Sequence, residues 1–133
     1  MTGVAPGGPV TVLVVEDDGA TRSFMAAALR TGGYTVLEAE GSEAADRMAS
    51  RFHVPMKLLV CDFVLPDGNG HEVAERMRER FPDIKVLLVS AHSAEPPVQD
   101  ALLEEAFKKG AAFLQKPFGL EDLLRKVQAV MRG

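Results

Sequence analysis

The sequence predicts an α/β fold in which a doubly wound, five-stranded parallel sheet carries five helices on its two faces. Short apolar, β-branched runs alternate five times with stretches of helical spacing along the 133 residues. The apolar runs are nearly continuous, which is typical of strands buried on both faces. Polar residues follow most of these runs directly, at the strand ends where sheets of this class bind their ligands.

Each expected strand is a short apolar run that stops at a turn signal or at a polar residue. The first stops at an acidic triplet that begins with Glu16, and the third delivers Asp62 at its C-terminal end. Runs of this length and β-branched composition favour parallel strands. The expected strands are Val10–Val15, Tyr34–Ala39, Lys57–Cys61, Ile84–Val89 and Ala111–Leu114.

Helical spacing of apolar residues fills the intervals between these strands. The first helix carries Phe24 and Leu29 on its apolar side and stops at Gly32-Gly33, a C-cap and turn signal. Ser42 is the candidate N-cap of the second helix, and Pro97 suits the first turn of the fourth. The later helices are expected over Ser42–Phe52, Gly70–Phe81, Pro97–Gly110 and Leu120–Met131.

The bulk composition indicates one globular domain. The chain is long enough for a single core and too short for two ordinary domains. Its hydrophobic fraction of 47% and charged fraction of 26% are typical of soluble proteins. A net charge of -4 gives no excess of positive charge that would attract nucleic acid or an anionic membrane. We expect the domain over residues 10–132, after a flexible Gly/Pro-rich tail over residues 1–9.

The sequence predicts a cytoplasmic protein. No run approaches the roughly 18–20 apolar residues that a membrane-spanning helix needs. The N-terminus has neither the basic start nor the apolar stretch of a signal peptide. Cys61 is the single cysteine, which excludes an internal disulfide and fits a reducing compartment.

Polar residues that could do chemistry follow four of the five expected strands. Glu16 and Asp17 follow the first strand, Asp62 the third and Ser90 the fourth, and Lys116 lies just past the fifth. We expect all of them to converge at one edge of the sheet. Crowded carboxylates in an open site favour a hard cation such as Mg²⁺. A lysine and a hydroxyl at the same edge would bind a tetrahedral anion.

Four segments at these strand ends resemble the signature blocks of response-regulator receiver domains of two-component systems. They occur in the family's order, and the match covers almost everything from Val10 to Met131. The resemblance implies the flavodoxin-like receiver fold. The segments are Val14-Val15-Glu16-Asp17-Asp18, Val60-Cys61-Asp62-Phe63-Val64-Leu65-Pro66-Asp67-Gly68, Val89-Ser90-Ala91 and Phe113-Leu114-Gln115-Lys116-Pro117-Phe118.

The resemblance implies a role for each residue that binds the phosphoryl group or responds to it. Asp62 resembles the phosphoryl-accepting nucleophile, and Lys116 the lysine that pairs with the phosphoryl group. Ser90 matches the switch hydroxyl that hydrogen-bonds this group. Phe113 matches the aromatic residue whose rotamer changes when the switch hydroxyl moves toward the phosphoryl group.

The resemblance also implies a Mg²⁺ site. Asp17 resembles the direct carboxylate ligand, and Glu16 its partner acting through water. Asp62 and the backbone carbonyl of Val64 would complete the protein ligands. Mg²⁺ and Lys116 would screen the repulsion between the Asp62 carboxylate and an anionic phosphoryl donor.

The implied function is that of a phosphoacceptor that switches a protein-interaction surface. The donor would be a histidine kinase or a histidine phosphotransfer protein, and the output a downstream protein target, with a phosphorylation-dependent homodimer as a further expectation. No direct contact with nucleic acid or membrane is expected. The domain would catalyse its own loading and unloading at Asp62 and would not be an enzyme on an external substrate.

Two other classes of protein are disfavoured. A haloacid-dehalogenase-type phosphatase with an aspartyl nucleophile needs a second Asp two residues after Asp62, where this chain has Val64. A nucleotide or flavin module would need a Gly-rich or hydroxyl-rich loop after the first strand, where this chain has the acidic triplet. Whether the receiver stands alone or belongs to a larger protein, such as a hybrid histidine kinase, stays open at this point.

Several residues near the blocks have structural interpretations. Asp18 is expected to cap the first helix, and Cys61 to point away from Asp62 into the core. The Lys116-Pro117 bond is expected to be cis by similarity to the family. His92, two residues beyond Ser90, is a candidate for the rim of the phosphoryl site.

The segment from Ser90 to Gly110 is several residues longer than the family usually has, and it contains Pro96-Pro97. This lengthens the loop before the fourth helix or reshapes that helix, which normally transmits the switch.

Overall fold

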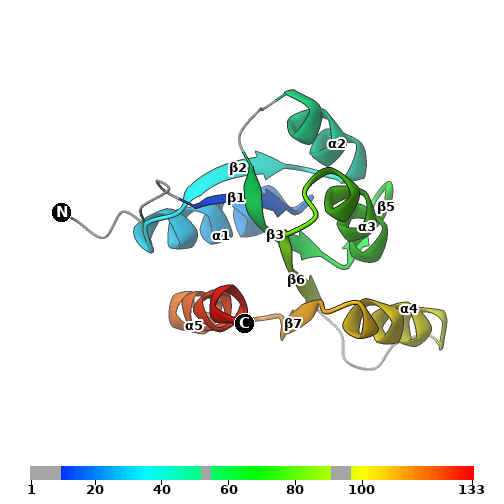
Figure 1. Ribbon diagram of the computed structural model, residues 1–133. Helices are drawn as coiled ribbons and strands as arrows, with labels where there is room; N and C mark the ends of the chain where they lie inside the picture. The colour runs from blue at the N-terminus through cyan, green and yellow to red at the C-terminus, as the bar shows by residue number, and fades with distance from the viewer. Residues whose placement is uncertain (1–9, 52–54, 91–96) are drawn as a thin grey trace.

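The centre of the protein is a five-stranded parallel sheet, seen in a computed structural model that describes residues 10–51, 55–90 and 97–133 (Figure 1). The strand order is β2-β1-β3-β6-β7, and every neighbouring pair is parallel. The predicted sheet is therefore confirmed, and its order changes direction beside β1 and β3, where ligands bind in such sheets. The strands are β1 Thr11–Val15, β2 Thr35–Ala39, β3 Met56–Asp62, β6 Lys85–Ser90 and β7 Ala112–Gln115.

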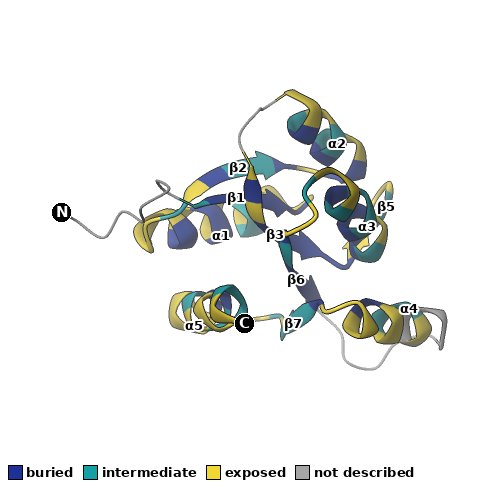
Figure 2. Ribbon diagram, in the orientation of Figure 1, coloured by how far each residue is buried: buried dark blue, intermediate teal, exposed yellow. Residues whose placement is uncertain are grey.

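Helices cover both faces of this sheet, as the doubly wound prediction requires (Figures 1 and 2). Buried side chains of α1 and α5 pack against one face, around Val14 and Val60. Buried side chains of α2, α3 and α4 pack against the other, around Leu13 and Leu59. The helices are α1 Gly19–Thr31, α2 Ser42–Arg51, α3 Gly70–Arg80, α4 Pro97–Lys108 and α5 Leu120–Arg132.

Within the described ranges, none of the helices has both the length and the apolar character that a bilayer crossing requires.

A small antiparallel hairpin, which the sequence did not predict, directly follows β3. Its strands are β4 Val64–Leu65 and β5 Gly68–Asn69, with Val64 opposite Asn69 and Leu65 opposite Gly68. Strands of two residues are too short to show an alternating hydrophobic pattern, so periodicity alone cannot detect them. The hairpin connects the end of β3 to the start of α3, close to Asp62.

The expected N-cap of α2 is wrong. Ser42 is the first residue of the helix, and the oxygen atoms that accept its first N–H groups belong to Asp67, far along the chain. A sequence pattern for a cap considers only neighbouring residues, so it missed this one. Asp18 does cap α1, as predicted, by accepting the Thr21 N–H at 2.8 Å.

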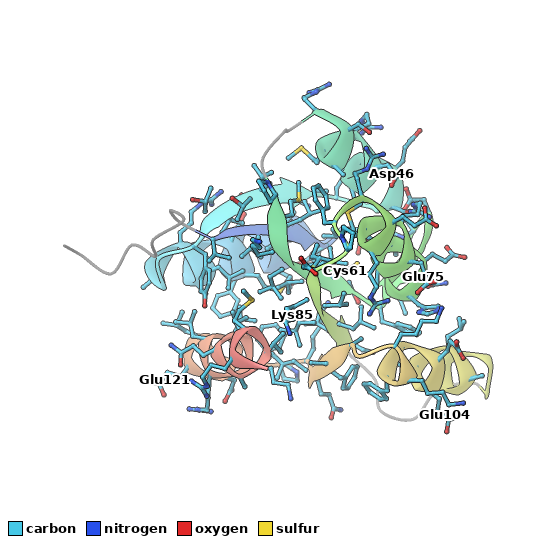
Figure 3. The ribbon with its side chains drawn as sticks, in the orientation of Figure 1. Asp46, Cys61, Glu75, Lys85, Glu104 and Glu121 are labelled. Atoms are coloured by element: carbon cyan, nitrogen blue, oxygen red, sulfur yellow. The ribbon has the colours of Figure 1, made fainter. Side chains whose placement is uncertain are left out.

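Cys61 is buried among apolar side chains near the centre of the molecule (Figure 3), as the alternation of β3 predicted. Burial, together with the charges of Asp62 and Glu16, raises the pKa of the Cys61 thiol well above its ordinary value. The thiol is therefore neutral at physiological pH and serves as a packing group.

Candidate functional site

The register of the sheet brings the predicted site residues to one edge. Val15 pairs with Cys61, so the next residues lie side by side: Glu16 just beyond the end of β1, and Asp62 as the last residue of β3. Asp62 in turn pairs with Val89. At the next strand pair, Ser90 is opposite Gln115, which places Lys116 just beyond the end of β7. Parallel strands thus deliver all four polar residues to their shared carboxyl edge, as expected.

Lys116 joins the two buried carboxylates of this edge. Its Nζ lies 2.7 Å from Oε1 of Glu16 and 2.9 Å from Oδ2 of Asp62. Glu16 is only 1% exposed and Asp62 8% exposed, so the Lys116 ammonium offsets part of the cost of placing two carboxylates in a poorly solvated site. Burial by itself lowers the pKa of Lys116, but hydrogen bonds to Glu16 and Asp62 outweigh it and raise that pKa.

Glu16 is held by further hydrogen bonds at its backbone and its side chain. The Asp18 N–H donates to Oε2 of Glu16 at 3.1 Å, and the Arg22 guanidinium donates to the Glu16 carbonyl at 2.8 Å. Arg22 also pairs with Glu38 of β2 at 3.5 Å. Sequence reasoning missed Arg22. The signal available was a basic residue in the first turn of the helix that follows the acidic triplet.

Three carboxylates in the described part of the chain are arranged so that they could hold a metal ion. Glu16, Asp17 and Asp62 each offer one oxygen, and these oxygens lie within 4.8 Å of one another. Asp17 is exposed, so the group opens to solvent. Hard oxygen donors in a partly open site suit Mg²⁺, which keeps several of its waters. The donor set therefore fits the predicted cation.

Val64 also lies beside the acidic group, as expected for a residue that would offer its backbone carbonyl. The Val64 N–H donates to Oδ1 of Asp62 at 3.3 Å, so its backbone is next to the candidate acceptor. The Val64 side chain is 49% exposed. Gly70 packs closely against the backbone of Asp62, since a Cβ there would lie 2.8 Å from the Asp62 carbonyl oxygen.

Ser90 lies on β6, the strand next to that of Asp62, and Phe113 lies on β7, the strand beyond β6. Ser90 is buried at the end of β6, and its carbonyl accepts the Lys116 N–H at 2.7 Å. Phe113 is half-buried in β7 and packs edge-on against Phe107 of α4, with ring centroids 6.0 Å apart. The Phe113 ring thus connects β7, which leads to Lys116, with α4, the helix that follows Ser90 in the chain.

Two further expectations concern this edge. The Lys116-Pro117 bond is cis, as predicted. The predicted rim residue His92 and the Pro96 part of the long segment lie outside the described residues, whereas Pro97 begins α4 as expected.

A hollow of about 320 Å³ opens beside Lys116 and is largely apolar. Phe24 of α1 is 40% exposed there, and its ring lies 6.3 Å from that of Phe118 between centroids. The lining residues are Ala20, Thr21, Phe24, Lys116, Pro117 and Phe118.

Known proteins share this arrangement of strands and helices. Residues 12–128 match the family described as the response regulator receiver domain. In the solved response regulator receiver domain protein (CheY-like) from Methanospirillum hungatei, the match has a TM-score of 0.79 and 25% identity, covering 94% of this chain and 95% of that one.

Two relatives differ in how much of their own length this chain covers. The chain is 32% identical to the response regulator receiver protein CpdR of Brucella abortus, over 90% of this chain and 95% of that protein. It is also 32% identical to the sensor kinase CckA of the same organism, over 93% of this chain but only 13% of the kinase. The chain therefore spans nearly all of one relative and a small part of the other.

Proposed function

This chain belongs to the response regulator receiver domain family of two-component signalling, and we propose that it accepts a phosphoryl group on Asp62 from a phosphorylated histidine of a partner protein. The observation that carries the proposal is the position of Lys116, whose Nζ contacts both Glu16 and Asp62. An ammonium group at this point can pair with an oxygen of a phosphoryl group bound to Asp62.

The proposed reaction transfers a phosphoryl group from a histidine nitrogen of the donor to a carboxylate oxygen of Asp62. A carboxylate oxygen of Asp62 forms a bond to phosphorus while the P–N bond of the phosphohistidine breaks. The imidazole nitrogen keeps the electron pair and takes up a proton from solvent. The product on Asp62 is an acyl phosphate, which water can hydrolyse in the same site, so the domain unloads itself.

Glu16, Asp17, Asp62 and the Val64 carbonyl would hold Mg²⁺, which would offset the negative charge that repels an anionic donor. Lys116 adds a fixed positive charge at Oδ2 of Asp62. Its raised pKa keeps it protonated, so it supplies this charge throughout the physiological pH range. Ser90 is proposed to donate its hydroxyl to the phosphoryl group.

A donor protein must bring its histidine to the carboxyl edge of the sheet. The exposed Phe24 and the hollow that it lines next to Lys116 offer apolar surface for that contact. Contiguous apolar surface beside polar groups is a common feature of protein docking sites. We propose that this surface contacts the phosphoryl donor, a histidine kinase or a histidine phosphotransfer protein in the cytoplasm.

The proposed output is a change in the face formed by α4, β7 and α5. Phosphoryl oxygens on Asp62 would draw Ser90 and the chain after it toward the site. Phe113 would respond because its ring extends from β7 and packs against Phe107 of α4. A downstream protein, or a second copy of this chain, would read the altered face.

Chemical trapping tests the assignment of the acceptor. Borohydride reduces an acyl phosphate on aspartate to homoserine, which peptide mapping can locate. After treatment with a phosphohistidine donor protein, we expect homoserine at position 62 and at no other aspartate. Homoserine at position 17, or at no position, would overturn the proposal.

A further inference from the structure

Asp67 joins the hairpin after the candidate acceptor to the start of a helix. Its Oδ1 accepts the Ser42 N–H at 2.8 Å, and its Oδ2 accepts the Glu43 N–H at 3.1 Å. These are the first two residues of α2, and the first N–H groups of a helix have no partner inside it. The carboxylate therefore fastens the β4–β5 turn to α2.

The contact is close because position 41 has no side chain. A Cβ at Gly41 would lie 2.8 Å from Oδ1 of Asp67 and 3.2 Å from Oδ2. Although Asp67 is exposed, the hydrogen bonds from Ser42 and Glu43 lower its pKa below the ordinary value of 3.8. The carboxylate is therefore charged at neutral pH and complements the positive N-terminus of α2.

The other end of the same segment is fixed at the candidate site. The Val64 N–H donates to Asp62, and the Phe63 carbonyl accepts the Gly70 N–H at 2.8 Å. Val64 is paired across the hairpin with Asn69. Val64, the residue that carries the candidate carbonyl, is thus held at Asp62 through its N–H. Its partner strand belongs to a hairpin whose turn is fastened to α2 by Asp67.

We infer that Asp67 is a positioning residue for the metal site, because it holds the β4–β5 hairpin so that the Val64 carbonyl stays in place to bind the cation. The inference rests on the proposed function, since it assumes that Val64 is a ligand. Outer residues that orient a metal ligand typically change metal affinity about 10- to 100-fold when they are removed.

A titration separates positioning from simple capping of α2. Mg²⁺ is added to the ¹⁵N-labelled chain, and Kd is obtained from the amide shifts of residues around Asp17 and Asp62. We expect Asp67→Ala to raise Kd for Mg²⁺ about 10-fold. Asp67→Asn keeps one oxygen acceptor, so it should raise Kd less.

Asn69→Ala is the matched control. Asn69 lies in the same hairpin, but its Oδ1 caps a different helix, α3, by accepting the Glu72 N–H at 2.9 Å. Its removal should lower the melting temperature and change Kd less than twofold. Gly41→Ala is a second route to the same effect, because the new Cβ displaces the Asp67 carboxylate while Asp67 itself is retained; it should also raise Kd.

The outcomes are distinct. If the wild type binds Mg²⁺ and Kd is the same in Asp67→Ala, Asp67→Asn and Gly41→Ala, Asp67 is only a cap and the inference is wrong. If Asp67→Ala does not fold, the other two variants decide. A wild type whose signals do not respond to Mg²⁺ contradicts the proposed metal site as well.

Discussion

The ammonium nitrogen of Lys116 lies 2.9 Å from Oδ2 of Asp62, although the two residues are 54 positions apart in the chain. The same nitrogen contacts Glu16, so one positive charge connects the ends of β1, β3 and β7. A bound cation would use oxygens of the same two carboxylates. Lys116 and the cation therefore have overlapping partners, which leads to the first prediction.

Replacing Lys116 by methionine should destabilise the fold and strengthen its response to Mg²⁺. Without the ammonium group, the buried Glu16 carboxylate faces Asp62 with no positive charge between them, which should cost about 1–3 kcal/mol of unfolding free energy. Mg²⁺ should restore more stability in this variant than in the wild type, because it no longer competes with Lys116. Urea unfolding with and without Mg²⁺ measures both effects.

Lys108→Met is the control for this experiment, because Lys108 is an exposed lysine of α4. It should leave the unfolding free energy nearly unchanged. Equal effects of Lys108→Met and Lys116→Met would show that the ion pairs of Lys116 contribute no stability.

Mg²⁺ should raise the melting temperature of the wild type. A cation at the proposed site would bind only the folded arrangement of Glu16, Asp17 and Asp62, so the stabilisation expected at roughly ten times Kd is on the order of 1–2 kcal/mol. Asp17→Asn should remove most of it. Asp83→Asn, which changes an exposed residue in the turn before β6, should retain it. A melting temperature unaffected by Mg²⁺ in all three proteins would argue against a shared metal site.

The sequence predicted the sheet, its helices and the convergence of Glu16, Asp62, Ser90 and Lys116, because these features depend on periodicity and on which residues follow a strand. Buried parallel strands show near-continuous apolar runs, and their carboxyl ends meet at one edge. From the strand ends alone, the sequence predicts that residues more than 50 positions apart lie close together.

Contacts between remote residues could not be predicted in the same way. The bonds of Asp67 to the start of α2 depend on the path of the β4–β5 hairpin, whose strands are too short for a periodic signal. Arg22 is only six positions from Glu16, but a basic residue in the first turn after the acidic triplet does not by itself specify a bond to the Glu16 carbonyl. The cap prediction for Ser42 fails because a cap pattern depends on neighbouring residues, whereas the acceptor at the start of α2 is Asp67.

The ion pair between Glu75 of α3 (labelled in Figure 3) and Lys109 should make stability depend on pH in the acid range. The hydrogen bond from Lys109 lowers the pKa of Glu75 below its ordinary value of 4.5. Since the unfolded chain binds this proton more readily, the contribution is fully present above about pH 4.5 and is lost as pH falls through the lowered folded-state pKa.

Glu75→Gln should therefore differ most from the wild type in unfolding free energy near neutral pH, and the difference should shrink below pH 4.5. Glu79→Gln, an exposed position on the same helix, is the control and should give a smaller, flatter difference. Urea unfolding at a series of pH values measures the difference in unfolding free energy between each variant and the wild type. A constant difference between wild type and Glu75→Gln across the acid range would contradict the assignment.

A beryllofluoride–Mg²⁺ mimic of the phosphoryl group should perturb backbone amide NMR signals from Ser90 through Phe113, beyond the immediate site. The mimic offers Ser90 a new acceptor, and it shifts the population only by its different affinity for the two states. Ser90→Ala should uncouple these signals while the site still binds the mimic. Ser50→Ala, at an exposed serine of α2, should behave as the wild type. Shifts confined to Asp17, Asp62 and Lys116 would place the output elsewhere.

Intact-mass spectrometry after incubation with acetyl phosphate and Mg²⁺ tests the central claim most directly. The wild type and Asp83→Asn should each gain the mass of one phosphoryl group, and hydroxylamine should remove it, since an acyl phosphate is labile to this nucleophile. Asp62→Asn should gain none, because the amide cannot replace the nucleophilic carboxylate at the end of β3. Undiminished phosphorylation of Asp62→Asn would contradict the assignment of Asp62 as the acceptor.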